Sequence, residues 1–259
     1  MKEQYGASVT VERIDTQALV RFDRGVNRNA INQDTLLALT EVANDLSPRL
    51  DIHSVVLTGA PDIFSAGIDL KDPAKWQEQE SDLLLRRDMA KRGSKLCQLW
   101  EDLPQLTIAA IEGAAVGGSV GLALACDWRV ASGSAFFYLP EAKVGLNMGW
   151  GAVPRMVNIL GASRAKQAIL LAPKLPAIQA QDWGLVDFLC DNGQAVTHAL
   201  EISEQVLQVS PAILRMTKES VNFYANTFNR LAAFMDADQA LVCRDSTEGV
   251  SARNKFLRS

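Results

Sequence analysis

Two short apolar runs, each followed by a glycine-containing loop and a helical pattern, limit the possible folds of this chain more than any other feature. The first run is His53–Gly59 (HSVVLTG), which precedes a loop at 60–72 and a helical region around Leu83–Leu103. The second is Leu106–Ile111, which precedes EGAAVGGSVGLALACD, a glycine-rich turn that leads into a helix of small residues. Successive strand-loop-helix units are joined by right-handed crossovers and form a largely parallel sheet. We therefore predict an α/β fold.

The patterns on either side extend this sheet and add helices. Alternating apolar residues over 9–22 predict two strands joined by a turn at Asp15 and Thr16. Helical spacing from Leu36 to Leu46 predicts a helix capped near Asn32. Three later strands are expected, at Trp128–Ala131, Ala135–Tyr138 and Leu185–Leu189. The 259 residues then divide into an α/β core over 1–195 and a helical region over 196–259.

Composition excludes several classes of function. Only two histidines occur, His53 and His198, so a mechanism or metal site that needs a histidine cluster is nearly excluded, and we expect no metal. A net charge of −4 gives no electrostatic case for nucleic acid. The four cysteines form no CxxC pair, which favours reduced thiols and a cytoplasmic location. Neither a secretory signal nor an apolar run of about 20 residues is present, so we expect no membrane segment.

Two glycine-containing loops are candidates for binding negative charge. In Phe64–Leu70 (FSAGIDL), Gly67 permits close backbone approach, and the next amide can point at an acceptor oxygen; the simpler interpretation is a tight turn. In Gly113–Gly121, free amides at a helix N-terminus favour a developing negative charge. If Gly118 and the amide near Ile68 act together, they form an oxyanion hole for a carbonyl.

The same glycine-rich segment permits a second interpretation. Gly117, Ser119 and Gly121 match the G-x-S-x-G pattern of a nucleophile elbow. That mechanism needs a histidine downstream, and the only one is His198, which falls in a predicted helix rather than in a loop. Packing of a small-residue helix explains Ser119 without chemistry.

Glu141 is a candidate general acid/base. It follows an aromatic strand and Pro140, and apolar surroundings raise the pKa of a glutamate towards neutrality. The alternative interpretation is a glutamate in the first turn of a helix, stabilised by the helix dipole.

Together these segments resemble the crotonase superfamily, the family of enoyl-CoA hydratases and isomerases. The resemblance covers nearly the whole chain and is carried by the order and spacing of Arg28–Ile31, Phe64–Leu70, Ile108–Asp127, Pro140–Leu146 and Ala180–Val186. It implies a crotonase-like spiral of ββα units, with 196–259 as a helical trimerisation region in a homotrimer or a dimer of trimers. It also implies an acyl-CoA thioester ligand, with coenzyme A as part of the substrate and no other cofactor.

The resemblance also assigns residues. The amides of Ile68 and Gly118 correspond to the oxyanion-hole donors. Residues implied to bind CoA or substrate are Ala66, Gly67, Asp69, Leu70 and Gly117, with Arg28 as a weaker candidate for the phosphates. Tyr138, Trp150 and the residues between Pro73 and Arg92 are candidates for lining the acyl pocket.

The chain departs from the family pattern at one of its two glutamates. Typical hydratases of the family place a glutamate where this chain has Gly121, and some relatives place a carboxylate where it has Gly149; only Glu141 remains. We expect hydration of an enoyl-CoA with Glu141 as the single acid/base, or else double-bond isomerisation with Glu141 as the proton shuttle. More remote alternatives are a serine hydrolase that uses Ser119 and a CoA-ester binder without activity.

Overall fold

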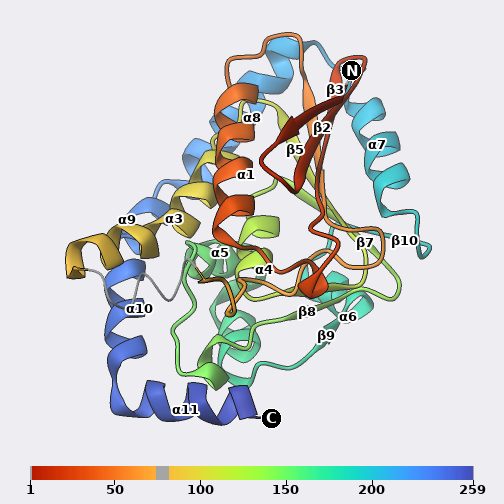
Figure 1. Ribbon diagram of the computed structural model, residues 1–259. Helices are drawn as coiled ribbons and strands as arrows, with labels where there is room; N and C mark the ends of the chain where they lie inside the picture. Colours follow the sequence, from red (N-terminus) through yellow and green to blue (C-terminus); the bar gives the residue numbers. More distant parts are fainter. Residues whose placement is uncertain (1, 74–81, 259) are drawn as a thin grey trace.

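A seven-stranded sheet forms the centre of the computed structural model, which describes residues 2–73 and 82–258 (Figure 1). Its strand order is β1-β2-β3-β4-β5-β7-β10, with β1, β2 and β3 antiparallel and the remaining neighbours parallel. The strands are β1 (Lys2–Tyr5), β2 (Val9–Ile14), β3 (Gln17–Phe22), β4 (Ser54–Thr58), β5 (Leu106–Ile111), β7 (Trp128–Ser132) and β10 (Phe188–Cys190). The predicted α/β class and the largely parallel sheet are confirmed.

The central parallel strands are buried on both faces, which explains their continuous apolar runs. In β4, Val55 and Leu57 belong to one core cluster, whereas Val56 between them belongs to a second cluster on the other face. Figure 1 shows α1 (Gln33–Leu46) and α7 (Ala195–Val206) on opposite sides of the sheet. The predicted cap is confirmed, because the Asn32 side chain accepts a hydrogen bond from the Thr35 amide at 3.0 Å.

A second, three-stranded sheet carries the loops of greatest interest. It consists of β6 (Ala114–Val116), β8 (Phe136–Tyr138) and β9 (Leu175–Pro176). The sequence pattern did not predict β6, because its three residues lie inside the glycine-rich segment. The strand predicted over Leu185–Leu189 is wrong in its bounds: the strand is Phe188–Cys190, and Leu185 and Val186 are buried just before it.

Helices cover the sheets and close one end of the molecule. The remaining helices are α3 (Leu83–Glu101), α4 (Gly118–Leu124), α5 (Ala152–Lys166), α6 (Ala177–Trp183), α8 (Pro211–Asn226), α9 (Asn229–Ala232), α10 (Asp236–Asp245) and α11 (Thr247–Arg258). Short 3-10 turns lie at Asn27–Asn29 and Glu141–Val144, and a π-helical turn at Gln167–Leu171.

The C-terminal region is not only a surface layer, because two of its helices pack against the rest of the chain. Helix α7 begins at the predicted division near residue 195 and packs Ala199 and Ile202 against the strands β4, β5 and β7. Helix α10 packs against α3, on the other side of the molecule. Residues on both sides of the predicted division therefore share one packed core.

Candidate active site

The two glycine-containing loops lie against each other. The Phe64 amide donates to the Glu112 carbonyl at 2.7 Å, and the Ser65 amide donates to the Ala114 carbonyl at 2.9 Å. Gly67 adopts φ +85°, and a Cβ at this position would lie 2.5 Å from the Val116 carbonyl oxygen. Only glycine permits both this conformation and this approach. The two loops, which are separate in the sequence, thus form one wall of a cavity.

The amides of Ile68 and Gly118 point to one function for this wall. Among the described residues, neither amide N–H takes part in a hydrogen bond, although their neighbours Gly67, Asp69 and Gly117 all donate one. Both residues line the same cavity, and Gly118 begins α4. Unpaired amides that line a cavity, one of them at a helix N-terminus, can bind a developing oxyanion.

Glu141 lines the same cavity from the 3-10 turn that follows β8. The Gly117 amide donates to the Tyr138 carbonyl at 2.8 Å, which fixes the end of β8 beside the glycine loop. Glu141 Oε1 lies 2.6 Å from the position that a Cβ on Gly117 would take, so this glycine leaves room for the carboxyl group. Glu141 Oε2 is buried and has no hydrogen-bond partner among the described residues. Burial raises the pKa of Glu141 to about 7.

Ser119 is not placed as a nucleophile. It is fully buried, and its hydroxyl oxygen accepts a hydrogen bond from the Val116 amide at 2.9 Å. The hydroxyl proton is shared between the backbone carbonyls of Ser65 and Val116. His198 lies on α7, where its ring pairs with Glu201. Ser119 therefore holds the two loops together, and the geometry offers no support for a serine hydrolase.

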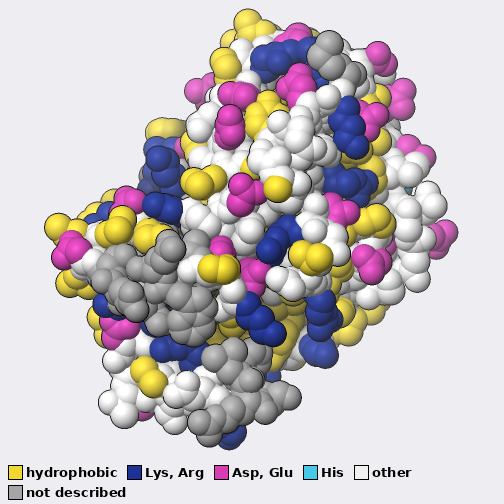
Figure 2. All heavy atoms as spheres, in the orientation of Figure 1, with side chains coloured by type: hydrophobic (Ala, Val, Ile, Leu, Met, Phe, Trp, Pro, Cys, Tyr) yellow, Lys and Arg dark blue, Asp and Glu magenta, His cyan; other side chains and the backbone are white. Residues whose placement is uncertain are grey.

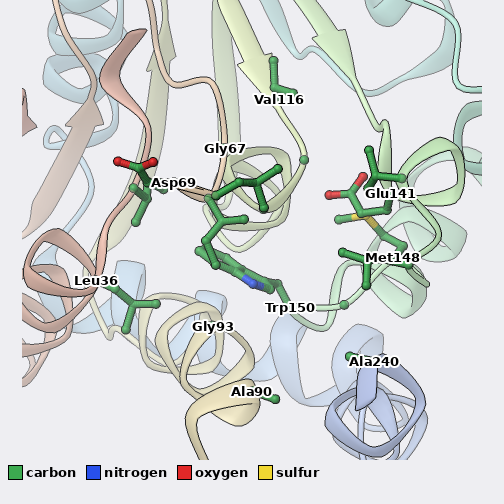
Figure 3. Close-up of a pocket in the computed structure, with 18 of the residues that line it drawn as sticks. Leu36, Gly67, Asp69, Ala90, Gly93, Val116, Glu141, Met148, Trp150 and Ala240 are labelled. Atoms are coloured by element: carbon green, nitrogen blue, oxygen red, sulfur yellow. The ribbon is translucent and has the colours of Figure 1, made fainter. Parts of the chain in front are cut away.

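These groups surround one apolar cavity of about 300 Å³ (Figure 3). All but one of the predicted binding residues line it: Ala66, Gly67, Asp69, Leu70 and Gly117 do, as do Tyr138 and Trp150. Of the predicted acyl-pocket segment, Met89 and Ala90 on α3 contribute, whereas residues 74–81 lie outside the described residues. Leu146 and Met148 complete the apolar side near Glu141.

The structure places Asp69 in the cavity lining and Arg28 outside it. Arg28 is exposed, and its carbonyl accepts from the Ala66 amide of the loop at 3.0 Å; its role toward the CoA phosphates stays a prediction. Asp69 is buried and its carboxylate pairs with Arg24 at 2.7 Å. Burial opposes its ionisation, but hydrogen bonds from Arg24, the Lys71 amide and Asn27 lower the pKa of Asp69 overall. Its side chain therefore holds the loop rather than offering a free carboxylate.

Three contributions were missed in the sequence. Gly93 on α3 lines the cavity beside Trp150. Arg244 on α10 also lines it, and its Nη2 is buried without a hydrogen-bond partner among the described residues. Asp236 accepts a hydrogen bond from the Gly151 amide at 2.7 Å. Of these three residues, only Arg244 has a side-chain type that could have suggested a binding role from the sequence. Helical spacing alone does not show which face of a C-terminal helix meets a site.

Two absences hold for the described residues. In 2–73 and 82–258, no group of three or more His, Cys, Asp or Glu side chains is placed to hold a metal ion. Within the same ranges, no helix is long and apolar enough to span a bilayer. Figure 2 shows basic and acidic side chains interspersed over the visible face.

Comparison with known proteins decides the family. The family model described as enoyl-CoA hydratase/isomerase matches residues 13–250. This chain belongs to the enoyl-CoA hydratase/isomerase family. The resemblance to the crotonase superfamily, and the expectation of an enzyme, are thereby confirmed.

Individual relatives agree in sequence and in fold. The chain is 30% identical to a short-chain-enoyl-CoA hydratase of Clostridium acetobutylicum, over 83% of this chain and 81% of the relative. It is 27% identical to a crotonyl-CoA hydratase of Syntrophomonas wolfei, over 95% and 94%. A crystal structure of an enoyl-CoA hydratase/isomerase from Xanthobacter autotrophicus Py2 superposes with a TM-score of 0.87 at 26% identity, covering 99% of this chain and 94% of that one. The crotonase fold is therefore confirmed.

Proposed function

We propose that this enzyme hydrates the double bond of an enoyl-CoA thioester, with Glu141 as the single acid/base. The observation that carries the proposal is the cavity that combines the unpaired amides of Ile68 and Gly118 with the buried, unpaired Oε2 of Glu141. The other carboxylates among the described lining residues, Asp69, Asp72 and Asp236, each accept a hydrogen bond from the protein.

In the proposed reaction the thioester oxygen accepts from the two amides. Ionised Glu141 takes a proton from a water molecule as the water oxygen bonds to C3, and the electrons of the double bond move into the thioester to give an enolate. Glu141 then returns the proton to C2, so that one water is added overall and the carboxylate is restored. Each amide donor contributes roughly 3 kcal/mol of transition-state stabilisation, by analogy with other oxyanion holes. No metal or further cofactor takes part, and coenzyme A enters as part of the substrate.

Isomerisation is the second candidate, and the lack of a carboxylate at positions 121 and 149 favours it. Glu141 would take a proton from C2 of a 3-enoyl-CoA to give a dienolate whose oxygen the same two amides bind, and would return the proton to C4 as the double bond moves to C2–C3. This reaction needs one base and no water, so a site with one glutamate is sufficient.

The CoA moiety is proposed to reach the cavity past Arg244. Nη2 of Arg244 and Nη1 of Arg253 are buried without hydrogen-bond partners among the described residues. The two residues are adjacent, since Arg253 Nη2 donates to the Arg244 carbonyl at 2.7 Å. Guanidinium groups with unused donors fit phosphate oxygens well, and we propose them as phosphate contacts in addition to Arg28.

The chain is proposed to assemble with copies of itself through its C-terminal helices. Large apolar side chains on and after α8 are exposed, including Phe223 at 80%, Tyr224 at 90% and Phe228 at 74%. Exposed apolar surface of this extent marks an interaction site, and the homotrimer or dimer of trimers that the resemblance implies would cover it. Light scattering on the wild type and on Tyr224→Lys tests this, because a charge at a buried interface lowers the oligomeric mass.

The activity is tested by incubating the enzyme with a panel of 2-enoyl and 3-enoyl CoA thioesters, followed by mass spectrometry. A gain of one water marks hydration, and an unchanged mass with a moved double bond marks isomerisation. Glu141→Gln is expected to lower kcat by about 10²- to 10⁴-fold, while Glu201→Gln on the surface of α7 serves as the matched control. Unchanged turnover in Glu141→Gln contradicts the assigned base.

A further inference from the structure

Three glycines from two helices make room for the Trp150 side chain, two of them for its ring and one for its Cβ. A Cβ on Gly93 of α3 would lie 2.3 Å from Cε2 and Nε1 of the ring, and a Cβ on Gly118 of α4 would lie 2.9 Å from Cε2. A Cβ on Gly121, one turn further along α4, would lie 3.1 Å from the Trp150 Cβ. Any side chain at Gly93 or Gly118 would displace the ring. In Figure 3 the indole lies at the middle of the cavity lining, directly above Gly93, with Glu141 to one side.

The backbone at Trp150 has an unfavourable conformation, and hydrogen bonds to the next residue, Gly151, hold it in place. Trp150 has φ +62°, a left-handed conformation that bulky residues rarely adopt, and Gly151 follows with φ +64°. The Gly151 amide donates to buried Asp236 at 2.7 Å. Arg155 donates to the Gly151 carbonyl at 3.0 Å and pairs with buried Glu101 through two contacts of 2.9 Å. Strain of this kind persists only where surrounding contacts fix it, and it concentrates at functional sites.

The position of the ring relates this loop to the reaction. The indole packs against Gly118, whose amide is one of the two assigned to the thioester oxygen. Trp150 and Met148 also line the cavity into which, in the proposed reaction, the acyl carbons beyond the double bond extend. The ring is therefore a candidate contact for the acyl group close to the reacting carbons.

We propose that Trp150 is the specificity-determining wall of the acyl pocket and restricts this enzyme to short, flat enoyl groups. This inference rests on the proposed function. The Trp150 side chain lies between α3 and α4, with its ring against Gly93 and Gly118 and its Cβ beside Gly121. A smaller residue at position 150 opens this volume to a longer or branched acyl chain.

The test compares kcat/KM for 2-enoyl-CoA thioesters with acyl chains of 4, 6, 8, 10 and 12 carbons. Wild type is expected to favour the shortest members, and Trp150→Ala to raise the ratio of kcat/KM for the 10-carbon over the 4-carbon substrate by tenfold or more, since single-methylene differences in apolar pockets already change kcat/KM by about 10-fold or more. Trp150→Leu and Trp150→Phe keep more of the packing and serve if Trp150→Ala does not fold. Trp183→Leu is the matched control, because Trp183 lies on α6 outside the cavity.

The outcomes separate the two proposals. Wild type that turns over no enoyl-CoA overturns the proposed function. Wild type that turns over the series while its chain-length ratio stays within twofold in Trp150→Leu and Trp150→Phe overturns the role of Trp150 alone. A ratio that shifts equally in Trp183→Leu also overturns it, because the change would then be a general effect of losing a tryptophan.

Discussion

Replacing Gly93 with alanine tests the contact between Gly93 and the Trp150 ring. The substitution is expected to lower the free energy of unfolding, whereas glycine to alanine in a helix interior normally raises it. In the interior of a helix, glycine to alanine normally stabilises by about 1 kcal/mol. Gly93 lies in the middle of α3, and it lacks the positive φ that would itself strain an alanine. The added methyl group, however, would lie 2.3 Å from the Trp150 ring, well inside van der Waals contact. Over-packing of this kind costs about 1–3 kcal/mol, so after the gain of about 1 kcal/mol we expect a net loss of up to about 2 kcal/mol in the free energy of unfolding.

A double-mutant cycle isolates the contact. With Trp150→Ala in the background the ring is absent, so Gly93→Ala is expected to stabilise by the ordinary 1 kcal/mol or so. The coupling energy between the two sites is then about 1–3 kcal/mol. Urea unfolding should be followed by circular dichroism at one fixed protein concentration, because Trp150 itself contributes fluorescence and the proposed self-assembly would make stability depend on concentration. If Gly93→Ala stabilises equally in both backgrounds, the indole does not pack against Gly93 and the reasoning about position 150 is refuted.

Three further predictions concern the rest of the site. Burial raises the pKa of Glu141 from 4.5 to about 7, so ionising it disfavours the folded state; this cost is absent below pH 4.5, grows between pH 4.5 and 7, and is complete above pH 7. Glu141→Gln should therefore gain up to about 3 kcal/mol in the free energy of unfolding at pH 8 and almost nothing at pH 4.5, while wild-type kcat/KM falls as the pH drops below 7; equal gains at both pH values would contradict the raised pKa. Ser119→Ala should keep enoyl-CoA turnover and lose about 1 kcal/mol of stability, since only backbone hydrogen bonds of the loops are removed, whereas lost turnover with an intact fold would restore a catalytic role for the serine. Glu101→Ala leaves the buried Arg155 charge unpaired and should cost about 3–5 kcal/mol in urea unfolding, against little change for Asp102→Ala at the exposed pair with Arg230.

The central sheet could be predicted from the sequence because strands buried on both faces have continuous apolar runs. The strand predicted at Leu106–Ile111 has those bounds in the structure, and the helix cap at Asn32 follows from local chemistry alone. The strand near residue 188 was misplaced because Leu185 and Val186 are buried without pairing, and a short apolar run does not distinguish the two cases.

The site could be predicted only in part. Glu141, Ile68 and Gly118 were identified through resemblance and spacing, and the structure places all three on one cavity. Arg28 was suggested by its residue type and the resemblance; the structure places it on the left-handed turn at Asn27–Asn29, outside the cavity lining, and its contact with CoA phosphates stays a prediction. The contact of Gly93 with Trp150 joins residues far apart in the chain. No local sequence pattern predicts that a glycine in a helix packs against a distant aromatic ring.

Gly121 acquires a different meaning once Trp150 is taken into account. From the sequence it is a missing carboxylate, a position from which a second acid/base has been lost. In the structure the space beside it is occupied, because the Trp150 Cβ lies 3.1 Å from where a side chain at Gly121 would begin. A side chain there would require Trp150 to move, and a glutamate would also bury its charge at a desolvation cost. Gly121 thus allows the Trp150 side chain to pack against α4, and the proposed chemistry is what one acid/base next to two amides can do.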